Sequence, residues 1–539
     1  MSSAMIVGLQ PDAVETGAEI LKAGGNAVDA AIACGLVQTV VDPLMCGIAG
    51  FGSMQIYLPS QNVHEFIDFH GRVPAAATAD MWKDRIIGET DDGFGFVLKG
   101  AVNDLGYQSI TTPGTLKAFR LAYERYCSLP WESLVAPAIR IATDGFVVTP
   151  GVHSYWTRSM DNVPGRISVA DRLSYSKYGR KIYCDNSNQP RAVGSLIQNP
   201  DLARTYEQIA KEGADCFYFG ELADVIDVDM RTNNGLLCKD DLRNYETDTT
   251  TPLWGTYRGL SVSTNQPPGG GVMLLEMLNI LESFDLKVMD HNSSEYIRTV
   301  SEAMKIATSD KETYVGDPKF IDVPIDRLID KSYAAEKADC IDKGERAHVE
   351  RLKLPESSGT TQATILDKQG GIVSMTHSLG MMSGVITDGL GFMYNGCMAV
   401  FDPRPGRAGS IAPGKSRFSS VAPTILFNNG KPLLALGAPG GTQIVMGVLQ
   451  SILNFVDFKM TPQEAVLAPR FSATSDTIMV TARIPRYAYR DLEAAGYKFD
   501  RSPYSYQIGS VHAIGFGEHG EPSGGADIPY GDGMALRID

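Results

Sequence analysis

Hydroxyl groups are concentrated in one short stretch of the chain. Residues 357–380 read SSGTTQATILDKQGGIVSMTHSLG, two alternating runs joined by a Gly-bearing turn, and this pattern predicts a β-hairpin. The first strand begins with Gly-Thr-Thr, and the second carries Ser374, Thr376 and Ser378. A hairpin with a structural role alone needs none of these hydroxyls, so their chemistry is the first question that the sequence raises.

Thr360 would be a nucleophile if it were the first residue of a chain. A threonine hydroxyl attacks poorly unless a base lies beside it, and the α-amino group of the same residue can serve as that base. An α-amine titrates at about 7.7–8.0, close to working pH. Thr360 becomes N-terminal only if the Gly359–Thr360 bond is cut, and Gly359 permits the strained geometry in which the hydroxyl reaches the preceding carbonyl. Gly-Thr-Thr also begins many structural strands, so these residues alone leave both interpretations open.

Bulk composition limits the class of protein. The chain has 539 residues, of which 43% are hydrophobic and 21% are charged, as in a globular protein with one large or two medium domains. Its net charge is −15 and its pI is near 5.1. An acidic surface repels phosphate backbones, so we expect no nucleic-acid partner.

The sequence also predicts a compartment. Eight cysteines are scattered along the chain without a CxxC pair, which favours reduced thiols in a cytoplasmic protein. The first residues, MSSAMIVGLQPDAVETGAEIL, show no basic region followed by an apolar one, as a secretory signal would. No run of about 18 apolar residues is present, so we expect no membrane span. A chain whose signal peptide had been removed would look the same, and that alternative stays open.

Several familiar motifs are absent or lack their context. A Walker A match at 409–416 follows a Pro-rich loop and precedes a strand pattern with Pro423, so nucleotide binding is not expected. His64-Glu65 lacks the second histidine of a zinc-binding HExxH helix, and no Cys/His cluster has zinc spacing. The GxSxG elbow of α/β-hydrolases is missing too. We therefore expect neither a metal nor an organic cofactor.

The order of predicted elements argues against a Rossmann fold. Helical periodicity dominates the first part of the chain, and strands dominate from residue 360 onward, without βαβ alternation. This favours an α+β fold with layered sheets, in which the Gly- and Pro-rich segment 402–417 is a long surface loop. The predicted helices are 11–23, 26–41, 114–145, 200–212, 271–284, 294–308 and 443–456, and the predicted strands are 50–58, 62–70, 361–367, 372–379, 421–427, 432–437, 478–482 and 511–516.

Seven segments occur in the order found in one known family. They include GAEILKAGGNAVDAAIA, NQPPGGGVMLLEMLNILE and RFSSVAPTILF, and they lie at 17–33, 107–119, 265–282, 295–320, 417–427, 437–444 and 524–533. Over nearly its whole length the chain resembles the γ-glutamyltransferase family of N-terminal-nucleophile hydrolases. The hairpin lies where members of that family cut themselves.

The resemblance implies a fold and a self-processing event. The fold is a four-layer αββα sandwich of the α+β class. Cleavage between Gly359 and Thr360 gives a large subunit, 1–359, and a small subunit, 360–539, which pair as a heterodimer, with a dimer of heterodimers as a further option. Thr360 is then both the nucleophile and the new N-terminus. The resemblance implies no metal and no organic cofactor.

Three further positions match the reaction centre of the family. Ser378 falls where the family has a second hydroxyl that hydrogen-bonds the nucleophile, and strand alternation places it beside 360–367. Gly440 and Gly441 match the pair whose backbone N–H groups form the oxyanion hole. Loss of one such donor typically slows a reaction by about 10²–10³-fold.

The carboxylate-binding group is only partly kept. In γ-glutamyl enzymes an arginine and a Ser-Ser pair hold the α-carboxylate of the substrate, and Ser419 and Ser420 match the pair. His70 stands at the arginine position, within DFHGRVP. Arg72 lies two residues further on, which is the same face if the strand continues, so it is a candidate clamp. The alternative is that Arg72 is a surface arginine that does not bind the substrate.

The ammonium-binding group is lost. Gly380, Cys397 and Val400 occupy the positions at which the family has amide donors and an acid. An ammonium group that is buried without a carboxylate partner costs several kcal/mol. We therefore expect γ-glutamyl substrates to bind poorly.

These changes predict hydrolysis of a small amide whose acyl part carries a carboxylate but no α-amine. Oxamate-like and glutaryl-like acyl groups both fit, and both activities occur among relatives of the family. The loop between Phe401 and Ser419 is short for a lid, which admits water and favours hydrolysis over transfer. Two alternatives stay open: a γ-glutamyltransferase or glutathione hydrolase, and a non-catalytic binding relative.

Overall fold

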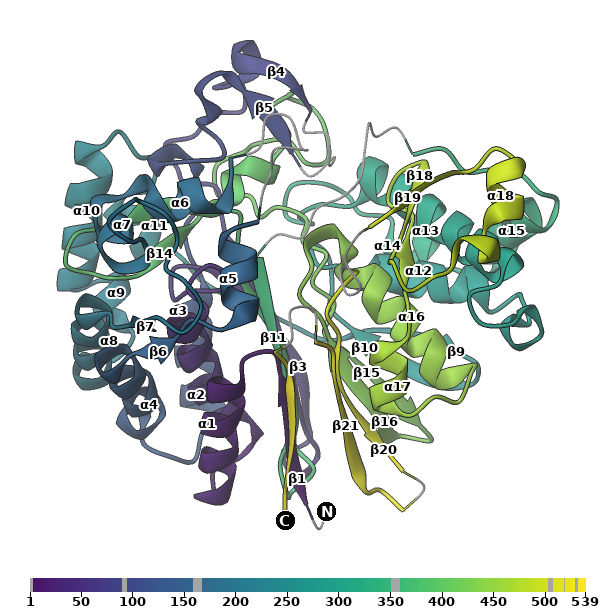
Figure 1. The fold of residues 1–539 in the computed structure, drawn as a ribbon, viewed down its shortest axis with the longest axis horizontal. Coiled ribbons are helices and arrows are strands. Elements are labelled where there is room, and N and C mark those ends of the chain that lie inside the picture. The colour runs from purple at the N-terminus through teal and green to yellow at the C-terminus, as the bar shows by residue number, and fades with distance from the viewer. Residues whose placement is uncertain are drawn as a thin grey trace.

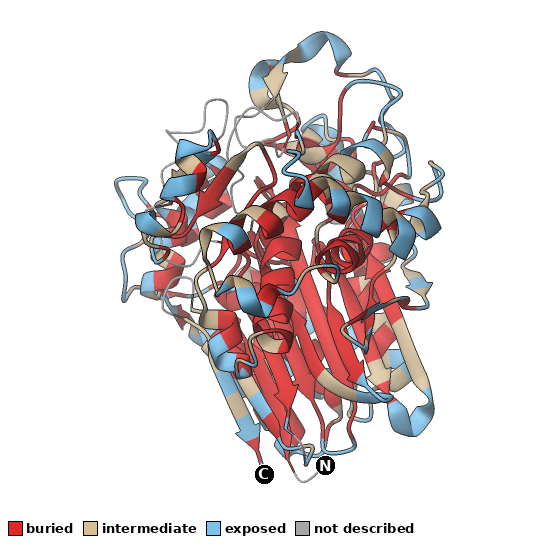
Figure 2. Ribbon diagram, turned by 90° about the vertical axis from the view of Figure 1, so that its right-hand side faces the viewer, coloured by how far each residue is buried: buried red, intermediate tan, exposed pale blue. Residues whose placement is uncertain are grey.

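The computed structural model consists of two β-sheets packed face to face between two layers of helices (Figure 1). It describes residues 3–89, 95–158, 167–349, 359–502, 508–517, 519–528 and 532–539. The predicted four-layer αββα sandwich is therefore confirmed. Figure 2 shows that buried residues fill the strands and the helix faces that cover them.

The first sheet contains the predicted hairpin at its centre. Its seven strands are, in spatial order, β22 (Met534–Ile538), β1 (Ala4–Gly8), β11 (Gly359–Leu366), β12 (Ile372–Gly380), β2 (Phe51–Leu58), β3 (Val63–Phe69) and β8 (Asp248–Thr250). All neighbouring pairs are antiparallel. The two ends of the chain lie side by side, because β1 pairs with β22 (Figure 1). The hairpin strands β11 and β12 are thus paired on both sides.

The second sheet faces the first across an apolar layer. Its strands are, in order, β21 (Pro522–Ala526), β20 (His512–Phe516), β16 (Lys431–Gly437), β15 (Thr424–Asn428), β10 (Leu260–Thr264) and β9 (Leu253–Tyr257). Val7 and Leu366 of the first sheet pack in one cluster with Ile425, Ala435 and Ile514 of the second. This packing fixes the distance between the sheets and so the place where their loops meet.

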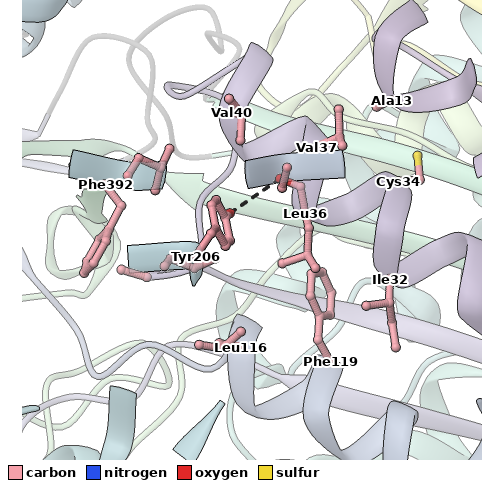
Figure 3. Packing of buried hydrophobic residues seen from close by; sticks show 14 of the residues in the cluster. Ala13, Ile32, Cys34, Leu36, Val37, Val40, Leu116, Phe119, Tyr206 and Phe392 are labelled. Carbon is pink, nitrogen blue, oxygen red and sulfur yellow. Dashed lines mark hydrogen bonds between the residues drawn. The ribbon is translucent and has the colours of Figure 1, made fainter. Parts of the chain in front are cut away.

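Helices cover the outer face of the first sheet, and their apolar side chains form a hydrophobic core with it. They include α1 (Pro11–Lys22), α2 (Ala27–Val41), α3 (Thr115–Tyr126), α4 (Trp131–Asp144) and α8 (Pro200–Glu212). The α2 helix is buried on all sides, and Asn26 begins it as a capping box with Asp29. Figure 3 shows Leu36 of α2 between Phe119 of α3 and Tyr206 of α8. The Tyr206 hydroxyl donates to the Leu36 carbonyl oxygen at 3.5 Å.

A second helical layer covers the other sheet. It includes α12 (Gly271–Leu281), α13 (Ser294–Tyr314), α15 (Lys331–Asp342), α16 (Ile444–Val456) and α17 (Pro462–Leu467). The Gly-rich stretch before α12 leads directly into that helix, as a turn rather than as a phosphate loop. Apolar residues of α12, α13 and α16 pack on β10, β15 and β16 as one cluster.

Smaller elements surround these layers. None of the helices in the described ranges has both the length and the apolar character of a membrane span. The remaining α-helices and strands of the described residues are α5 (Pro150–Trp156), α6 (Val169–Tyr175), α7 (Lys177–Tyr183), α9 (Asp215–Tyr218), α10 (Glu221–Thr232), α11 (Lys239–Arg243), α14 (Ile325–Leu328), α18 (Arg490–Ala494), β4 (Ile86–Glu89), β5 (Phe96–Leu98), β6 (Phe146–Val147), β7 (Leu196–Ile197), β13 (Met382–Ile386), β14 (Met393–Asn395), β17 (Phe471–Ser472), β18 (Thr477–Val480) and β19 (Lys498–Arg501).

The predicted elements are correct in type and differ at their ends. The single helix predicted at 114–145 is two helices, α3 and α4, which Pro130 separates. The strand predicted at 421–427 begins only at Thr424, because Pro423 has no N–H to donate to a ladder. The segment 402–417 contains no helix or strand, as predicted for a long loop.

Candidate active site

The Thr360 hydroxyl lies between a second hydroxyl and the carbonyl that precedes it. Thr360 Oγ1 is 2.9 Å from Ser378 Oγ and donates to the Gly359 carbonyl oxygen at 2.7 Å. Ser378 Oγ donates to the same carbonyl oxygen. Thr360 is only 2% exposed. The hydroxyl is therefore already in contact with the peptide group that self-cleavage would attack.

The strand ladder has an irregularity at this point. The register pairs Gly359 with Gly380 and Thr361 with His377, and the irregularity between them falls at Thr360. Gly380 has a φ of +65°, and its N–H donates to Ser378 Oγ at 2.7 Å. Counted on from the Thr361–His377 pair, Ser378 falls opposite Thr360, as strand alternation predicts, and the extra residue of β12 lies between Ser378 and Gly380.

The other two hydroxyls of the second strand have structural roles. Ser374 Oγ donates to the Leu436 carbonyl oxygen of the facing sheet at 3.1 Å. Thr376 Oγ1 donates to the side chain of Gln362 on the neighbouring strand. Of the three hydroxyls that the sequence singles out, only that of Ser378 reaches the candidate nucleophile.

Gly359 is fixed by its surroundings. A Cβ atom at this position would collide with the backbone carbonyl oxygen of Leu44 and would lie 3.2 Å from the Tyr155 hydroxyl oxygen. The backbone of Leu44 follows a buried helix and cannot move aside cheaply. A side chain is therefore excluded immediately before Thr360.

Two glycines form a sharp turn after β16. Gly440 and Gly441 have φ angles of +138° and +56°, a region that favours glycine. Gly440 directly precedes the short 3₁₀ turn Gly441–Gln443, which leads into the N-terminus of α16, where backbone N–H groups carry partial positive charge. Gly441 and Thr360 line the same cavity.

That cavity is far larger than the nucleophile needs. Its volume is about 1080 Å³, and its walls come from the first sheet at Phe51 and Thr360, from α13 and α16 of the second helical layer, from the β4–β5 hairpin and from the 402–417 loop. The described residues that line it include four lysine or arginine side chains and three carboxylates, namely Lys311, Arg404, Arg407, Arg417, Glu89, Glu312 and Asp402. Its wall is thus not acidic, although the chain as a whole has a net charge of −15.

Arg417 is the cation nearest to the predicted ammonium site. Its side chain is buried, and its guanidinium carbon lies 4.6 Å from the centre of the Phe51 ring. A Cβ atom on Gly380 would lie 3.5 Å from Arg417 Nη2 and 2.9 Å from Cys397 Sγ. Burial lowers the pKa of Arg417, and its contact with Cys397 opposes that shift. A cation therefore lies where two of the lost amine-binding positions meet.

Comparison with known proteins decides the family. The model of the gamma-glutamyltranspeptidase family matches residues 13–536. The chain belongs to this family. It is also 36% identical over 532 residues, 97% of this chain and 92% of its relative, to the acylase ACY 1 proenzyme of Pseudomonas sp. (strain V22).

Other relatives of this gamma-glutamyltranspeptidase family member include glutathione hydrolases. The glutathione hydrolase proenzyme of Escherichia coli (strain K12) is 33% identical over 552 residues, 97% of this chain and 90% of that protein. The crystal structure of cephalosporin acylase from Bacillus halodurans superposes with a TM-score of 0.87 at 29% identity, over 99% of this chain and 96% of that chain. Family and fold therefore indicate an enzyme, an amide hydrolase or transferase, rather than a non-catalytic relative.

Within this family member, the Ser-Ser pair lies at the cavity and the two predicted basic residues do not. Ser419 and Ser420 both line it, and the Ser419 N–H donates to the Pro268 carbonyl oxygen at 2.8 Å. Arg72 Nη2 instead pairs with Asp248 Oδ2 at 3.2 Å, and its guanidinium lies over the Tyr245 ring. The prediction for Arg72 assumed a continuing strand, but β3 ends at Phe69, so the alternation no longer applies.

His70 is also displaced from the cavity wall. It is buried, and its Nε2 lies 3.8 Å from Asp68 Oδ1. Burial lowers the pKa of His70 to about 4, although the carboxylate of Asp248 opposes this shift. The imidazole is therefore neutral at working pH and is not a cation that could replace the family arginine.

Of the remaining predicted positions, Gly380 and Cys397 lie beside Arg417 and Val400 lies elsewhere on the cavity wall. Val400 lines the cavity, and Cys397 is buried with its Sγ 3.6 Å from the Leu379 carbonyl oxygen. Sequence reasoning identified the loss at these positions but missed Arg417 itself. The available signal was its place in KSRFSS, two residues before the retained Ser-Ser pair.

The 402–417 loop forms the outer wall of the cavity and is tied down at several points. Arg404 pairs with Asp402 at 2.7 Å and with Glu89 of the β4–β5 hairpin at 3.3 Å, and it lies over the Phe96 ring. Lys415, which the Walker A match would assign to a phosphate, donates instead to the carbonyl oxygens of Ala408 and Ser410. In the described residues, no group of three or more His, Cys, Asp and Glu side chains could hold a metal ion.

Proposed function

We propose that the chain is a self-processing threonine amidohydrolase for amides whose acyl part carries a carboxylate but no α-amine. The observation that carries this proposal is the buried guanidinium of Arg417 beside Gly380 and Cys397. An ammonium group placed there would be repelled, whereas a carboxylate would form a charge-assisted pair. Ser419 and Ser420, which also line the cavity, supply hydroxyl donors to the same acyl group.

The charges of the cavity wall support an anionic substrate. Four lysine or arginine side chains against three carboxylates give this wall a slight positive excess within an acidic protein. Charges inside a cleft act on a ligand more strongly than charges spread over the surface, because the low-dielectric walls focus the field. A carboxylated substrate would be drawn to this wall and repelled elsewhere.

Self-cleavage follows from the contacts of Thr360. Its Oγ attacks the carbonyl carbon of Gly359, the C–N bond breaks, the nitrogen keeps the proton from the hydroxyl, and an ester links the two parts. Water then hydrolyses the ester and leaves a free α-amine on Thr360. The products are the large subunit, 1–359, and the small subunit, 360–539.

The sheet topology explains why these two subunits would remain together. Strand β11 of the small subunit lies between β1 of the large subunit and its own partner β12. Strand β12 in turn pairs with β2 of the large subunit. Separation would break two antiparallel ladders in the middle of a buried sheet, so we propose a stable heterodimer. A dimer of such heterodimers stays a prediction.

Turnover uses the same Thr360 hydroxyl, with the freed α-amine of Thr360 as its base. The freed α-amine takes the proton from Oγ as it attacks the substrate amide, and it returns a proton to the leaving amine. Ser378 Oγ, 2.9 Å from the nucleophile, orients its hydroxyl. The N–H groups of Gly440 and Gly441 stabilise the oxyanion, and water releases the acyl group from Thr360.

A comparison of four substrates tests the proposed specificity. We expect kcat/KM for glutaryl-p-nitroanilide to exceed that for γ-glutamyl-p-nitroanilide by at least about 10-fold, the effect of roughly 1.4 kcal/mol. Valeryl-p-nitroanilide, which has neither charged group, is the control for acyl length, and oxamate tests the short acyl group. A clear preference for the γ-glutamyl compound would identify a γ-glutamyl hydrolase or transferase instead.

A cytoplasmic location remains a separate prediction. All eight cysteines are free, and five of them are buried. Free thiols fit a reducing compartment but do not require one. Fractionation of the native host cells, with detection of the small subunit, would test this prediction directly.

A further inference from the structure

Self-cleavage would place the nucleophile at a chain end. Ends of chains are poorly ordered unless something holds them, whereas catalysis needs the reacting atoms within a fraction of an ångström. In the uncut chain, Gly359 is paired with Gly380 on one side of Thr360. After the cut that covalent tether is gone, so the next residue, Thr361, becomes the first fixed point of the small subunit.

Thr361 is held by its side chain as well as by the ladder. Its hydroxyl donates to Gln10 Oε1 at 2.8 Å and accepts from Gln38 Nε2 at 3.0 Å. Gln38 Nε2 also donates to Gln10 Oε1 at 2.8 Å, which closes a triangle of three side chains. All three are buried. Gln10 precedes α1 and Gln38 lies in α2, so both partners belong to the large subunit.

The triangle is anchored at two further points. Gln10 Nε2 donates to Asp42 Oδ2 at 2.9 Å. Gln38 Oε1 is 2.8 Å from His377 Nε2, and burial lowers the pKa of His377 to about 3, so a neutral imidazole donates this bond. Both amide groups are thereby fixed in orientation, and the Thr361 hydroxyl has one donor and one acceptor in place.

We propose that Thr361 is a positioning residue: with Gln10 and Gln38 it fixes the chain end that carries the nucleophile once the Gly359–Thr360 bond is cut. The inference rests on the proposed function, because it presupposes that cut. It predicts that the two reactions of Thr360 depend on Thr361 differently. Self-cleavage retains the tether through Gly359, whereas turnover does not.

The test compares Thr361→Val with Thr361→Ser and Thr364→Val. Thr361→Val keeps the shape and removes the hydroxyl, and we expect kcat to fall by about 10- to 100-fold with KM changed by less than about 3-fold. Thr361→Ser restores the hydroxyl and should recover most of kcat. Thr364 is the matched control, because it is buried in the same strand and its hydroxyl donates to the His512 carbonyl oxygen at 3.0 Å. Thr364→Val should keep wild-type kcat.

The rate of self-cleavage, followed on denaturing gels, separates positioning from general damage. We expect Thr361→Val to change it by less than about 3-fold. Wild-type kcat in Thr361→Val, or an equal loss of self-cleavage and turnover, would overturn the inference. If Thr361→Val does not fold, Gln10→Met replaces it in the test, because it removes the acceptor of the same hydroxyl. The same loss of kcat and the same nearly unchanged self-cleavage rate are then expected of Gln10→Met.

The experiments distinguish a failure of the proposed function from a failure of the Thr361 inference. The kinetics are measured on whichever p-nitroanilide the wild type hydrolyses best. A wild type that prefers the γ-glutamyl compound contradicts the proposed substrate but leaves the Thr361 comparison intact. A wild type that is active with residues 359 and 360 still joined, as mass spectrometry would show, overturns both.

Discussion

The two regions that meet in the cavity differ in how much of the family pattern they keep. At the candidate nucleophile, Thr360 and Ser378 retain their hydroxyls, and Gly441, in the turn after β16, lines the same cavity as Thr360. A second region begins only two residues further along β12, at Gly380. Gly380, Cys397 and Val400 stand where the family pattern predicts amide donors and an acid, and the guanidinium of Arg417 lies beside Gly380 and Cys397. In the proposed mechanism, the reaction and its specificity are therefore set by neighbouring but separable parts of the chain.

The supporting structure of the two regions differs as well. The nucleophile lies in the central ladder of a seven-stranded sheet, and its partners are fixed by backbone pairing. Cys397, Val400 and Arg417 lie in a 3₁₀ turn and at the end of a long loop. Loops tolerate substitution better than central strands, so charge can change there while the reacting geometry stays the same.

Removal of the nucleophile should give the largest effect and tests the first region. Thr360→Ala should remain one band near 58.3 kDa on a denaturing gel. It should lose turnover by at least about 10⁴-fold, because no covalent route remains. Thr364→Ser, in the same strand, is the control and should be processed normally. Cleavage of Thr360→Ala between residues 359 and 360 would show that another group performs the processing.

Replacement of Arg417 tests the second region. Arg417→Met should lower kcat/KM for glutaryl-p-nitroanilide by about 10²–10³-fold, because it leaves a buried carboxylate without its partner. The valeryl compound should be affected by less than about 3-fold, since it has no charge to pair. Arg72→Met is the matched control, and its ion pair with Asp248 predicts little change. A larger loss of kcat/KM in Arg72→Met than in Arg417→Met would show that Arg72, and not Arg417, binds the substrate carboxylate.

A carboxylate added beside Arg417 should also weaken the preference for the glutaryl substrate, but by less. Cys397 contacts the Arg417 guanidinium, so Cys397→Asp would neutralise it internally. We expect the ratio of glutaryl to γ-glutamyl kcat/KM to fall by about 10-fold, the effect of one weakened charge pair. Cys397→Ser keeps the size without the charge and should leave the ratio within about 2-fold. An unchanged ratio in Cys397→Asp would show that the acyl carboxylate binds elsewhere.

The smallest effect on activity is expected from His512, which contributes to neither region. Its two ring nitrogens have no hydrogen-bond partner among the described residues, and burial lowers its pKa to about 3. The unfolded chain binds a proton below about pH 6.5 and the folded chain does not, so stability falls as pH drops from 7 to 5, by about 2 kcal/mol for this residue.

His512→Leu should remove that part of the pH dependence. The midpoint of urea unfolding should fall less between pH 7 and pH 5 in the variant than in the wild type, while kcat at pH 7 stays the same. Asp42 and Asp68, whose pKa values burial raises to about 7, titrate in both proteins and cancel in the comparison. An equal pH dependence in both proteins would contradict the assignment of His512 as buried and neutral.

Sequence reasoning worked where the relevant contacts are local. The hairpin places Ser378 opposite the start of β11 by alternation and turn geometry, and the structure has the two hydroxyls 2.9 Å apart. The helices and strands were found from their apolar periodicity, and their ends were misplaced where a proline intervenes, as at Pro130 before the helix α4 and at Pro423 before the strand β15. These errors concern a few residues and leave the layers unchanged.

The differences between prediction and structure at the site have a different origin. Arg72 was a candidate clamp because the strand was extended past its true end at Phe69. Arg417 was missed because its guanidinium reaches Gly380 and Cys397 from a distant part of the chain, across the ring of Phe51. The position of Arg417 two residues before Ser419 was a signal in the sequence, but no spacing records its contact with Gly380 and Cys397.

The sequence by itself determined the family and the layered fold, and it predicted the hydroxyl that the proposed self-cleavage would use, because these depend on ordered segments, periodicity and neighbouring residues. Only the tertiary structure decided which cation lies beside the lost amine site and which side chains hold the residue after the nucleophile. The reason is physical: a buried charge or hydrogen bond takes its partner from whatever the packed layers bring within about 3 Å, and that set is not ordered along the chain.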